Sequence, residues 1–147
     1  MARAGRRPAP IYPRYFIIGI NDKFENFQNE ILVAARLLLG GAFIFAGLRN
    51  IQNRKLVASL MAARGVPQAG PALWAGIVLQ VAAGALVIAG MWTALSAAAL
   101  IVFLVVATPM FHNFWDHQGP DRASRINGVV SNVALGGGFL ALIAHYL

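Results

Sequence analysis

ALWAGIVLQVAAGALVIAGMWTALSAAALIVFLVVATPMF, residues 72–111, decides the fold, because no residue in this stretch carries a formal charge. A single helix of this length would extend about 60 Å, roughly twice the hydrocarbon thickness of a bilayer. The stretch must therefore fold back on itself. Its midpoint falls at Gly90–Thr93, where a glycine loosens the helix and Trp92 suits a membrane interface. We predict two antiparallel spans joined by a very tight turn.

Two further apolar runs lie outside this stretch. Ile31–Leu48 is interrupted only by Arg36, and Gly128–Leu147 ends with the chain. Open sheet edges cannot exist in lipid, and these runs do not alternate with a period of two. The sequence therefore predicts an all-α, integral membrane four-helix bundle with both termini on one side. The expected transmembrane helices are residues 31–49, 72–92, 94–112 and 128–146.

The composition of the chain agrees with a membrane protein. Of 147 residues, 59% are hydrophobic and 12% are charged, whereas a soluble domain carries about 25% charge. The positive residues behind the net charge of +7 lie between the apolar runs and in the N-terminal tail, so we predict a lipid bilayer as partner and no nucleic acid. Because there is no cysteine, any redox chemistry requires a bound cofactor. A multi-pass location in the bacterial inner (plasma) membrane is expected.

Residues 1–30 differ from the rest and are predicted to form a basic, proline- and aromatic-rich arm, followed by one domain at 31–147. The apolar piece Tyr15–Ile20 is too short for a signal peptide core, so we expect the arm to be retained. Its prolines predict an extended segment that lies on the membrane interface or on a partner subunit. Asp22 and Glu25 have capping-box spacing, which predicts a helix start near Asp22. Residues 52–64 read as an interfacial helix.

Antiparallel spans allow each polar residue to be assigned to one membrane face. We call side A the face reached after the first span. Side A gathers Arg49, Asn50, Thr108, His112, Trp115, Asn127, Ser131 and Asn132, whereas Arg36, Trp92, Thr93 and His145 belong toward side B. Gln80 lies near mid-membrane. Basic residues flank side A closely, which favours side A as cytoplasmic. The basic residues of the N-terminal tail favour the opposite orientation; they are Arg3, Arg6, Arg7, Arg14 and Lys23.

The histidines do not suit a haem. His112 and His145 lie near opposite ends of adjacent spans, about 25 Å apart, so one iron cannot bridge them. His112 and His117 share side A, but a metal between them would require the loop to rearrange. We predict no metal site and no catalytic residue.

The densest polar and aromatic cluster is Phe111–His117. It is consistent with an aromatic interface belt, or with a site for the headgroup of a quinone or another amphipathic ligand, because a histidine exchanges hydrogen bonds and aromatic walls stack on a flat ring. In the second interpretation the ligand-binding residues are His112, Phe114, Trp115 and Arg49. Intramembrane polar residues are further candidates: Arg36, Gln80 and Asn132. Gln80 is also consistent with a simple bridge between helices, and Arg36 with a side chain that snorkels to side B.

The order of these features resembles the DoxX family of small four-helix membrane proteins. The resemblance covers residues 33–145 and rests on Arg36, on Phe43–Arg49 (FIFAGLR), on Gly65-Val66-Pro67, on Gly84 and Gly90, and above all on Phe111–Trp115 (FHNFW). It implies a partner of oxidoreductases, such as the membrane part of a thiosulfate:quinone oxidoreductase. Where the family resemblance implies an acidic residue in the second span, this chain has Gln80, and an amide cannot relay a proton.

Two classes of function follow from the sequence. The first is an accessory, noncatalytic subunit that anchors or stabilises a larger, redox-linked membrane complex, with partner subunits bound through the N-terminal arm and the helix faces. The second is a quinone-interacting subunit of a membrane oxidoreductase. The accessory role ranks slightly ahead because the chain lacks cysteine, a haem pair and the acidic residue. A small-molecule transporter ranks third, since few polar residues lie at mid-depth to line a path.

Overall fold

The computed structural model describes the backbone of residues 14–147 and the side chains of residues 23–147. The chain divides into two units, of which the second comprises Ala34–Leu147. The predicted extended prolines at positions 8, 10 and 13 lie outside the described residues. Helix α1 (Arg14–Gln52) contributes its residues from Ala34 onward to the second unit.

The predicted helix start near Asp22 is wrong. Helix α1 begins at Arg14, directly after Pro13 in the sequence, and passes through Asp22 without interruption. The spacing of Asp22 and Glu25 fits the interior of a helix as well as its start, because residues three apart are neighbours on a helix surface. The spacing alone therefore did not distinguish a cap from a continuing helix.

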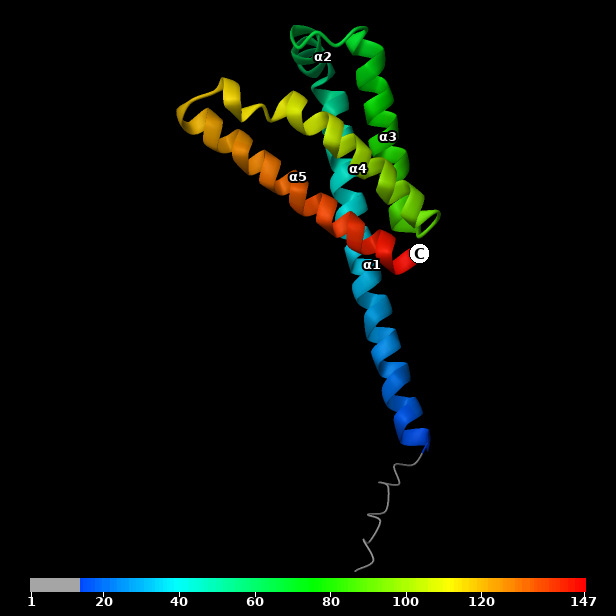
Figure 1. The fold of residues 1–147 in the computed structure, drawn as a ribbon. Coiled ribbons are helices and arrows are strands. Elements are labelled where there is room, and N and C mark those ends of the chain that lie inside the picture. Colours follow the sequence, from blue (N-terminus) through cyan, green and yellow to red (C-terminus); the bar gives the residue numbers. More distant parts are fainter. Residues whose placement is uncertain (1–13) are drawn as a thin grey trace, which may run out of the picture. The chain divides into compact units, whose positions relative to one another are not determined.

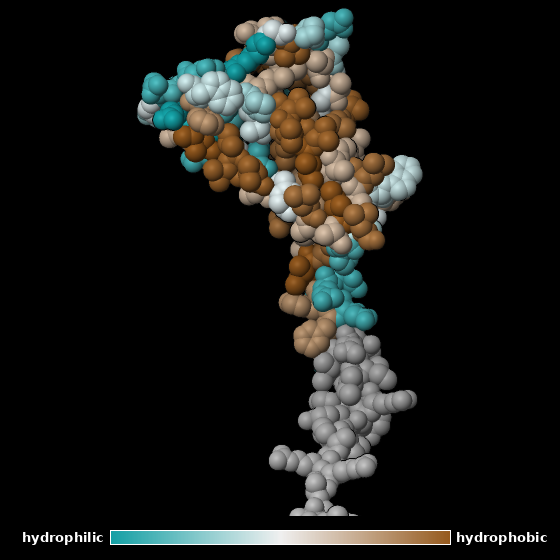
Figure 2. Space-filling view, in the orientation of Figure 1, coloured by the Kyte–Doolittle hydropathy of each residue, from teal (hydrophilic) through white to brown (hydrophobic). Residues whose placement is uncertain are grey.

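The all-helical fold with four membrane spans is confirmed. Within the described residues, four helices are long and apolar enough to cross a membrane: α1 from Lys23, α3 (Ala69–Ala89), the α4 region (Thr93–Asp116) and α5 (Gly119–Tyr146). Figure 2 shows hydrophobic side chains over the middle of the second unit on the face in view, whereas hydrophilic ones gather at the end that carries α2 and the α4–α5 connection. Such an apolar belt matches a hydrocarbon environment.

The tight turn predicted at the centre of the long apolar stretch is confirmed. Helix α3 ends at Ala89, and α4 (Thr93–Phe111) begins after only three residues. Gly90 adopts a left-handed conformation with φ of 73°, and the Met91 N–H donates to the Leu86 carbonyl at 3.0 Å. A glycine tolerates this φ without a steric penalty, which lets α3 end abruptly.

Within the second unit, α4 packs against both α3 and α5 (Figure 1). Helices α1 and α3 approach closely where two glycines meet: a Cβ atom on Gly84 would lie 2.8 Å from the carbonyl oxygen of Gly40. Phe43 fills the centre, with its ring centroid 5.3 Å from that of Phe139 and 6.2 Å from that of Phe103. Small residues thus allow backbone contact while aromatic side chains fill the core.

At side A the helices extend beyond the apolar runs. The helix predicted for residues 52–64 is present as α2 (Arg54–Ala63). A short 3₁₀ turn, η1 (Phe114–Asp116), connects α4 to α5, which begins at Gly119 instead of residue 128. The early turns of α5 carry Asp121, Arg122 and Arg125, so hydropathy marked only the part of this helix that is suited to lipid.

Candidate functional site

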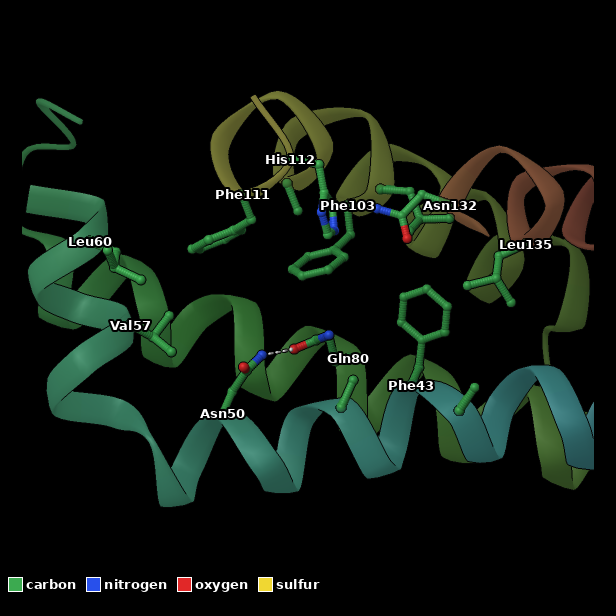
Figure 3. A pocket seen from close by; sticks show the side chains of 14 residues that line it. Phe43, Asn50, Val57, Leu60, Gln80, Phe103, Phe111, His112, Asn132 and Leu135 are labelled. Carbon is green, nitrogen blue, oxygen red and sulfur yellow. Dashed lines mark hydrogen bonds between the residues drawn. The ribbon is translucent and has the colours of Figure 1, made fainter. Parts of the chain in front are cut away.

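A cavity of about 290 Å³ lies at side A of the bundle and is lined by residues of all five α-helices, α1 to α5 (Figure 3). Its walls are mostly apolar and include three phenylalanine rings, those of Phe43, Phe103 and Phe111. Its polar lining comes from four side chains: Asn50, Gln80, His112 and Asn132. An apolar chamber with a few convergent polar groups is the usual form of a small-molecule site.

One polar group of the cavity is a pair of amides. Asn50 of α1 donates from Nδ2 to Oε1 of Gln80 on α3 over 3.1 Å, which Figure 3 shows as a dashed line. Gln80 is 4% exposed, so its amide is shielded from lipid. This hydrogen bond uses one donor and one acceptor, and each side chain keeps further hydrogen-bonding capacity.

A second polar group joins α4 to α5. Asn132 donates from Nδ2 to Oγ1 of Thr108 at 2.9 Å, and the Thr108 hydroxyl donates to the Leu104 carbonyl at 2.6 Å. These two successive hydrogen bonds hold the side-chain amide of Asn132 in one orientation. Its carbonyl oxygen remains an acceptor on a side chain that lines the cavity.

His112 follows the last residue of α4, and its ring points into the cavity (Figure 3). One edge of the ring packs against Gly128 of α5, where a Cβ atom would collide with Nδ1, Cε1 and Cγ of the imidazole. The ring therefore occupies space that only a glycine leaves open. The two nitrogens of this ring can exchange hydrogen bonds, and His112 lines the same cavity as the Asn50–Gln80 pair and Asn132.

Behind His112, an arginine fastens the end of α4 to α5. Arg125 donates from Nη1 to the Phe111 carbonyl and to Oδ1 of Asn113, each at 2.8 Å. Asn113 is only 1% exposed and donates to Oδ2 of Asp116 at 2.6 Å. Carbonyls at a helix end lack intrahelical partners, and a guanidinium satisfies them well. This network holds the segment that carries His112.

An adjoining chamber of about 260 Å³ extends toward α2 and α3. It shares Asn50, Gln80, Phe103 and Phe111 with the first cavity, and its remaining walls are apolar, including Met61, Leu73, Ile77 and Met110. The two spaces therefore adjoin along these shared residues, and α2 contributes Val57 to both. Both are mostly apolar, and His112 and Asn132 line only the first.

The structure places only part of the predicted site around the cavity. His112, Gln80 and Asn132 line it, whereas Arg49, Phe114 and Trp115 lie outside its lining. Arg49 and Trp115 are exposed, and Trp115 packs its ring edge-on against Phe114 with centroids 5.3 Å apart. Arg36 lies at the opposite end, near Gly90 and Tyr146. In the part of the chain that the structure describes, no group of three metal-ligating side chains is found.

Several lining residues were not identified as site residues in the sequence. Asn50 was placed at side A, but its pairing with Gln80 depends on the close approach of α1 and α3. Phe43 and Phe103 look like ordinary core residues in an apolar run. The sequence gives one indication for Gly128. It is the first residue of the apolar run Gly128–Leu147, and the next glycine in that run is Gly136.

Comparison with known proteins adds a family and a relative. The model of the family described as DoxX matches residues 31–113. The chain is 27% identical over 113 residues to "Inner membrane protein YphA" of Escherichia coli (strain K12), an alignment that covers 76% of this chain and 80% of that protein. No solved structure matches the chain. The family match includes α2, α3, α4 and His112.

Proposed function

This chain belongs to the DoxX family and is a multi-pass inner membrane protein, and we propose that it binds the headgroup of a quinone in the side A cavity, as a subunit of a redox-linked membrane complex. The single observation that carries the proposal is that His112, Asn132 and the Asn50–Gln80 pair line one cavity together with three phenylalanine rings. The sequence alone favours the accessory role, and the cavity is the reason to rank quinone binding above it.

Shape and polarity both support a flat ring with polar oxygens. Three phenylalanines provide surfaces against which an aromatic or quinonoid ring packs favourably. A cavity near 300 Å³ falls at the lower end of the usual range for small-molecule sites, which spans about 300–1,000 Å³. The cavity is therefore of a size suited to a headgroup, with the rest of a lipid ligand placed elsewhere.

The available hydrogen bonds match both redox forms of such a ring. A neutral His112 has one donor and one acceptor nitrogen, so it can donate to a quinone oxygen or accept from a quinol hydroxyl. Asn132 keeps its carbonyl oxygen as an acceptor, and Gln80 keeps its amide N–H groups as donors. These residues bind and orient the ring, and electron transfer belongs to the bound quinone and a partner subunit.

The adjoining chamber of about 260 Å³ could hold the hydrocarbon tail of the quinone. It adjoins the cavity that contains His112 at Phe103 and Phe111 and continues past Met61 and Ile77. A hydrocarbon tail gains from contact with such walls, and methionine adapts to irregular chains. The ring would occupy the cavity that contains His112 and Asn132, while the first part of the tail follows the α2–α3 side.

A purely accessory, noncatalytic subunit is the second candidate, and an open small-residue face favours it. A Cβ atom added at Gly136 or Gly137 of α5 would meet no atom within 4 Å among the described residues. Small residues on a lipid-facing helix permit close approach of another helix. Stable, stoichiometric copurification of a partner that is lost in Gly137→Leu, with no quinone bound, would favour this role over the first.

The binding proposal is tested with the full chain in nanodiscs of defined phospholipid, titrated with decylubiquinone. We expect saturable binding that Ala107→Phe weakens strongly, because Ala107 lines both chambers. Ala85→Phe is the matched control, since Ala85 is an exposed residue of α3 outside these chambers. Nonsaturable uptake, or equal binding by both variants, would overturn the proposal.

A further inference from the structure

The end of the bundle opposite the cavity carries a second set of polar groups. Arg36 of α1 lays its guanidinium over Gly90, the residue that ends α3, and donates from Nη1 to the hydroxyl of Tyr146 at 3.0 Å. The Arg36 Nε atom is buried and has no hydrogen-bond partner among the described residues. A cation within a membrane span needs a counter-charge or a polar surface, and Tyr146 supplies only a neutral oxygen.

Thr93 directly follows the α3–α4 turn, on whose Gly90 the Arg36 side chain lies, and it is 3% exposed. Its Oγ1 is buried and likewise lacks a partner within the described residues. Thr93 is the first residue of α4, and Trp92 before it makes no side-chain cap. The first N–H groups of a helix have no intrahelical partner, and the helix dipole makes this end positive. Arg36 Nε and Thr93 Oγ1 are thus two buried polar atoms near the α3–α4 turn that have no hydrogen-bond partner within the described residues.

A pocket of about 440 Å³ lies at this position, lined by Gly90, Trp92, Thr93, Ala94, Leu95 and Tyr146. Tyr146 accepts from Arg36 and keeps its own hydroxyl proton for donation. Met91 and Trp92 are 57% and 73% exposed, which is typical of residues at the lipid–water interface. The pocket therefore lies at the level of lipid headgroups, where the common anion is a phosphodiester.

An apolar groove continues from this pocket along the outer surface of α3 and α4. It measures about 630 Å³ and shares Trp92 and Leu95 with the pocket. Its other walls include Trp74, Val78 and Leu86, and it contains almost no polar group apart from Ser96. A groove that joins a headgroup pocket and runs toward mid-membrane has the form of an acyl-chain site.

We propose that side B of this protein binds one anionic phospholipid, with its phosphate held by Arg36, Thr93 and Tyr146 and one acyl chain in the α3–α4 groove. Thr93 and Tyr146 line the pocket and Arg36 donates to Tyr146, so a phosphate in the pocket would lie beside all three residues. This site is separate from the side A cavity, and the two proposals stand or fall independently.

The test is native mass spectrometry of the full chain released from detergent, titrated with dioleoylphosphatidylglycerol or with zwitterionic dioleoylphosphatidylcholine. Arg36→Gln should weaken phosphatidylglycerol binding by about fivefold or more, which corresponds to roughly 1 kcal/mol for one basic residue near an anionic lipid. Phosphatidylcholine carries the same phosphodiester but no net charge, so its binding should be weaker and should fall less in Arg36→Gln. Arg64→Gln is the matched control, because Arg64 is an exposed arginine at side A.

Thr93→Val keeps the shape of the side chain and serves as the second variant. If Thr93 binds lipid, this variant loses the rise in melting temperature that phosphatidylglycerol gives to the wild type. If Thr93 is only structural, that rise is unchanged, which contradicts the proposal. Equal phosphatidylglycerol affinity in wild type and Arg36→Gln would also overturn it, as would displacement of the lipid by excess inorganic phosphate, which would identify a site for the free anion.

Discussion

Gly128 of α5 lies directly against the imidazole ring of His112, so closely that a Cβ atom at position 128 would overlap the ring. The two residues belong to different helices and meet where α4 ends and the α4–α5 connection begins. This contact sets the position from which His112 faces the cavity (Figure 3). A backbone position without a side chain is thus part of the candidate site.

Replacing Gly128 with alanine should displace the His112 ring. We expect a loss of about 1–3 kcal/mol in the free energy of unfolding, typical of inserting a methyl group into a packed contact. Gly136→Ala is the control, because a Cβ atom there meets nothing within 4 Å. It should be neutral or slightly stabilising, since alanine is the better helix former. Thermal unfolding in one detergent compares the two variants. Equal stabilities would show that the His112 ring leaves room for a methyl group at position 128, which would contradict this prediction.

Arg125 should stabilise the α4–α5 connection far more than its neighbour Arg122. Arg125→Met removes hydrogen bonds to the Phe111 carbonyl and to buried Asn113, and we expect a loss of about 1.5–3 kcal/mol for such charge-assisted bonds. Arg122→Met removes only an exposed cation 6.0 Å from the Phe114 ring, which is worth about 0.5–1 kcal/mol. Denaturant unfolding of both variants measures the difference, and a reversed order would refute this assignment.

The Asn50–Gln80 hydrogen bond should contribute little to stability. Interhelical hydrogen bonds in membranes average about 0.6 kcal/mol, so Gln80→Leu should unfold at nearly the wild-type temperature. The double-mutant cycle with Asn50→Leu should give a coupling energy of similar size. Decylubiquinone binding, by contrast, should fall in Gln80→Leu, because the buried amide lines both chambers. A large stability loss with unchanged binding would make the pair structural.

Most of the fold could be predicted from the sequence because lipid leaves a chain few choices. An uncharged run of this length must turn once, and Gly90 indicates where. The helix ends were predicted less well. Helix α5 begins at Gly119 because polar residues form its first turns outside the apolar layer, where hydropathy gives no signal.

The candidate site could be predicted only in part. His112 and Asn132 share side A, so membrane topology alone brings them to one end of the bundle. Whether a side chain faces the interior or the lipid depends on helix rotation, which the apolar runs do not encode when they are hydrophobic on every face. Trp115 lies in η1, after the end of α4, where the sequence does not indicate which way a side chain points. It is exposed and outside the cavity lining although it was predicted to bind the ligand.

Side A should face the cytoplasm. The α1–α3 connection carries Arg54, Lys55 and Arg64, whereas the α3–α4 turn at residues 90–92 carries no basic residue. The positive-inside rule counts such residues close to the spans. The chain contains no cysteine, so a single cysteine introduced by substitution is the only residue of this protein that a maleimide labels. Met91→Cys should react with an impermeant maleimide in intact cells and Ser59→Cys only after lysis, and the opposite pattern would reverse the orientation.

The most direct test of the quinone proposal is the amount of decylubiquinone bound per protein by wild type, His112→Ala and His145→Ala, purified identically with equal helix content. His145 is an exposed histidine outside the cavity lining and controls for the loss of an imidazole. Losing the His112 contact should cost about 1–3 kcal/mol, or roughly five- to 150-fold in affinity, while His145→Ala binds like the wild type. Equal binding by all three proteins, or none by any, would contradict the assignment of this cavity as a quinone site.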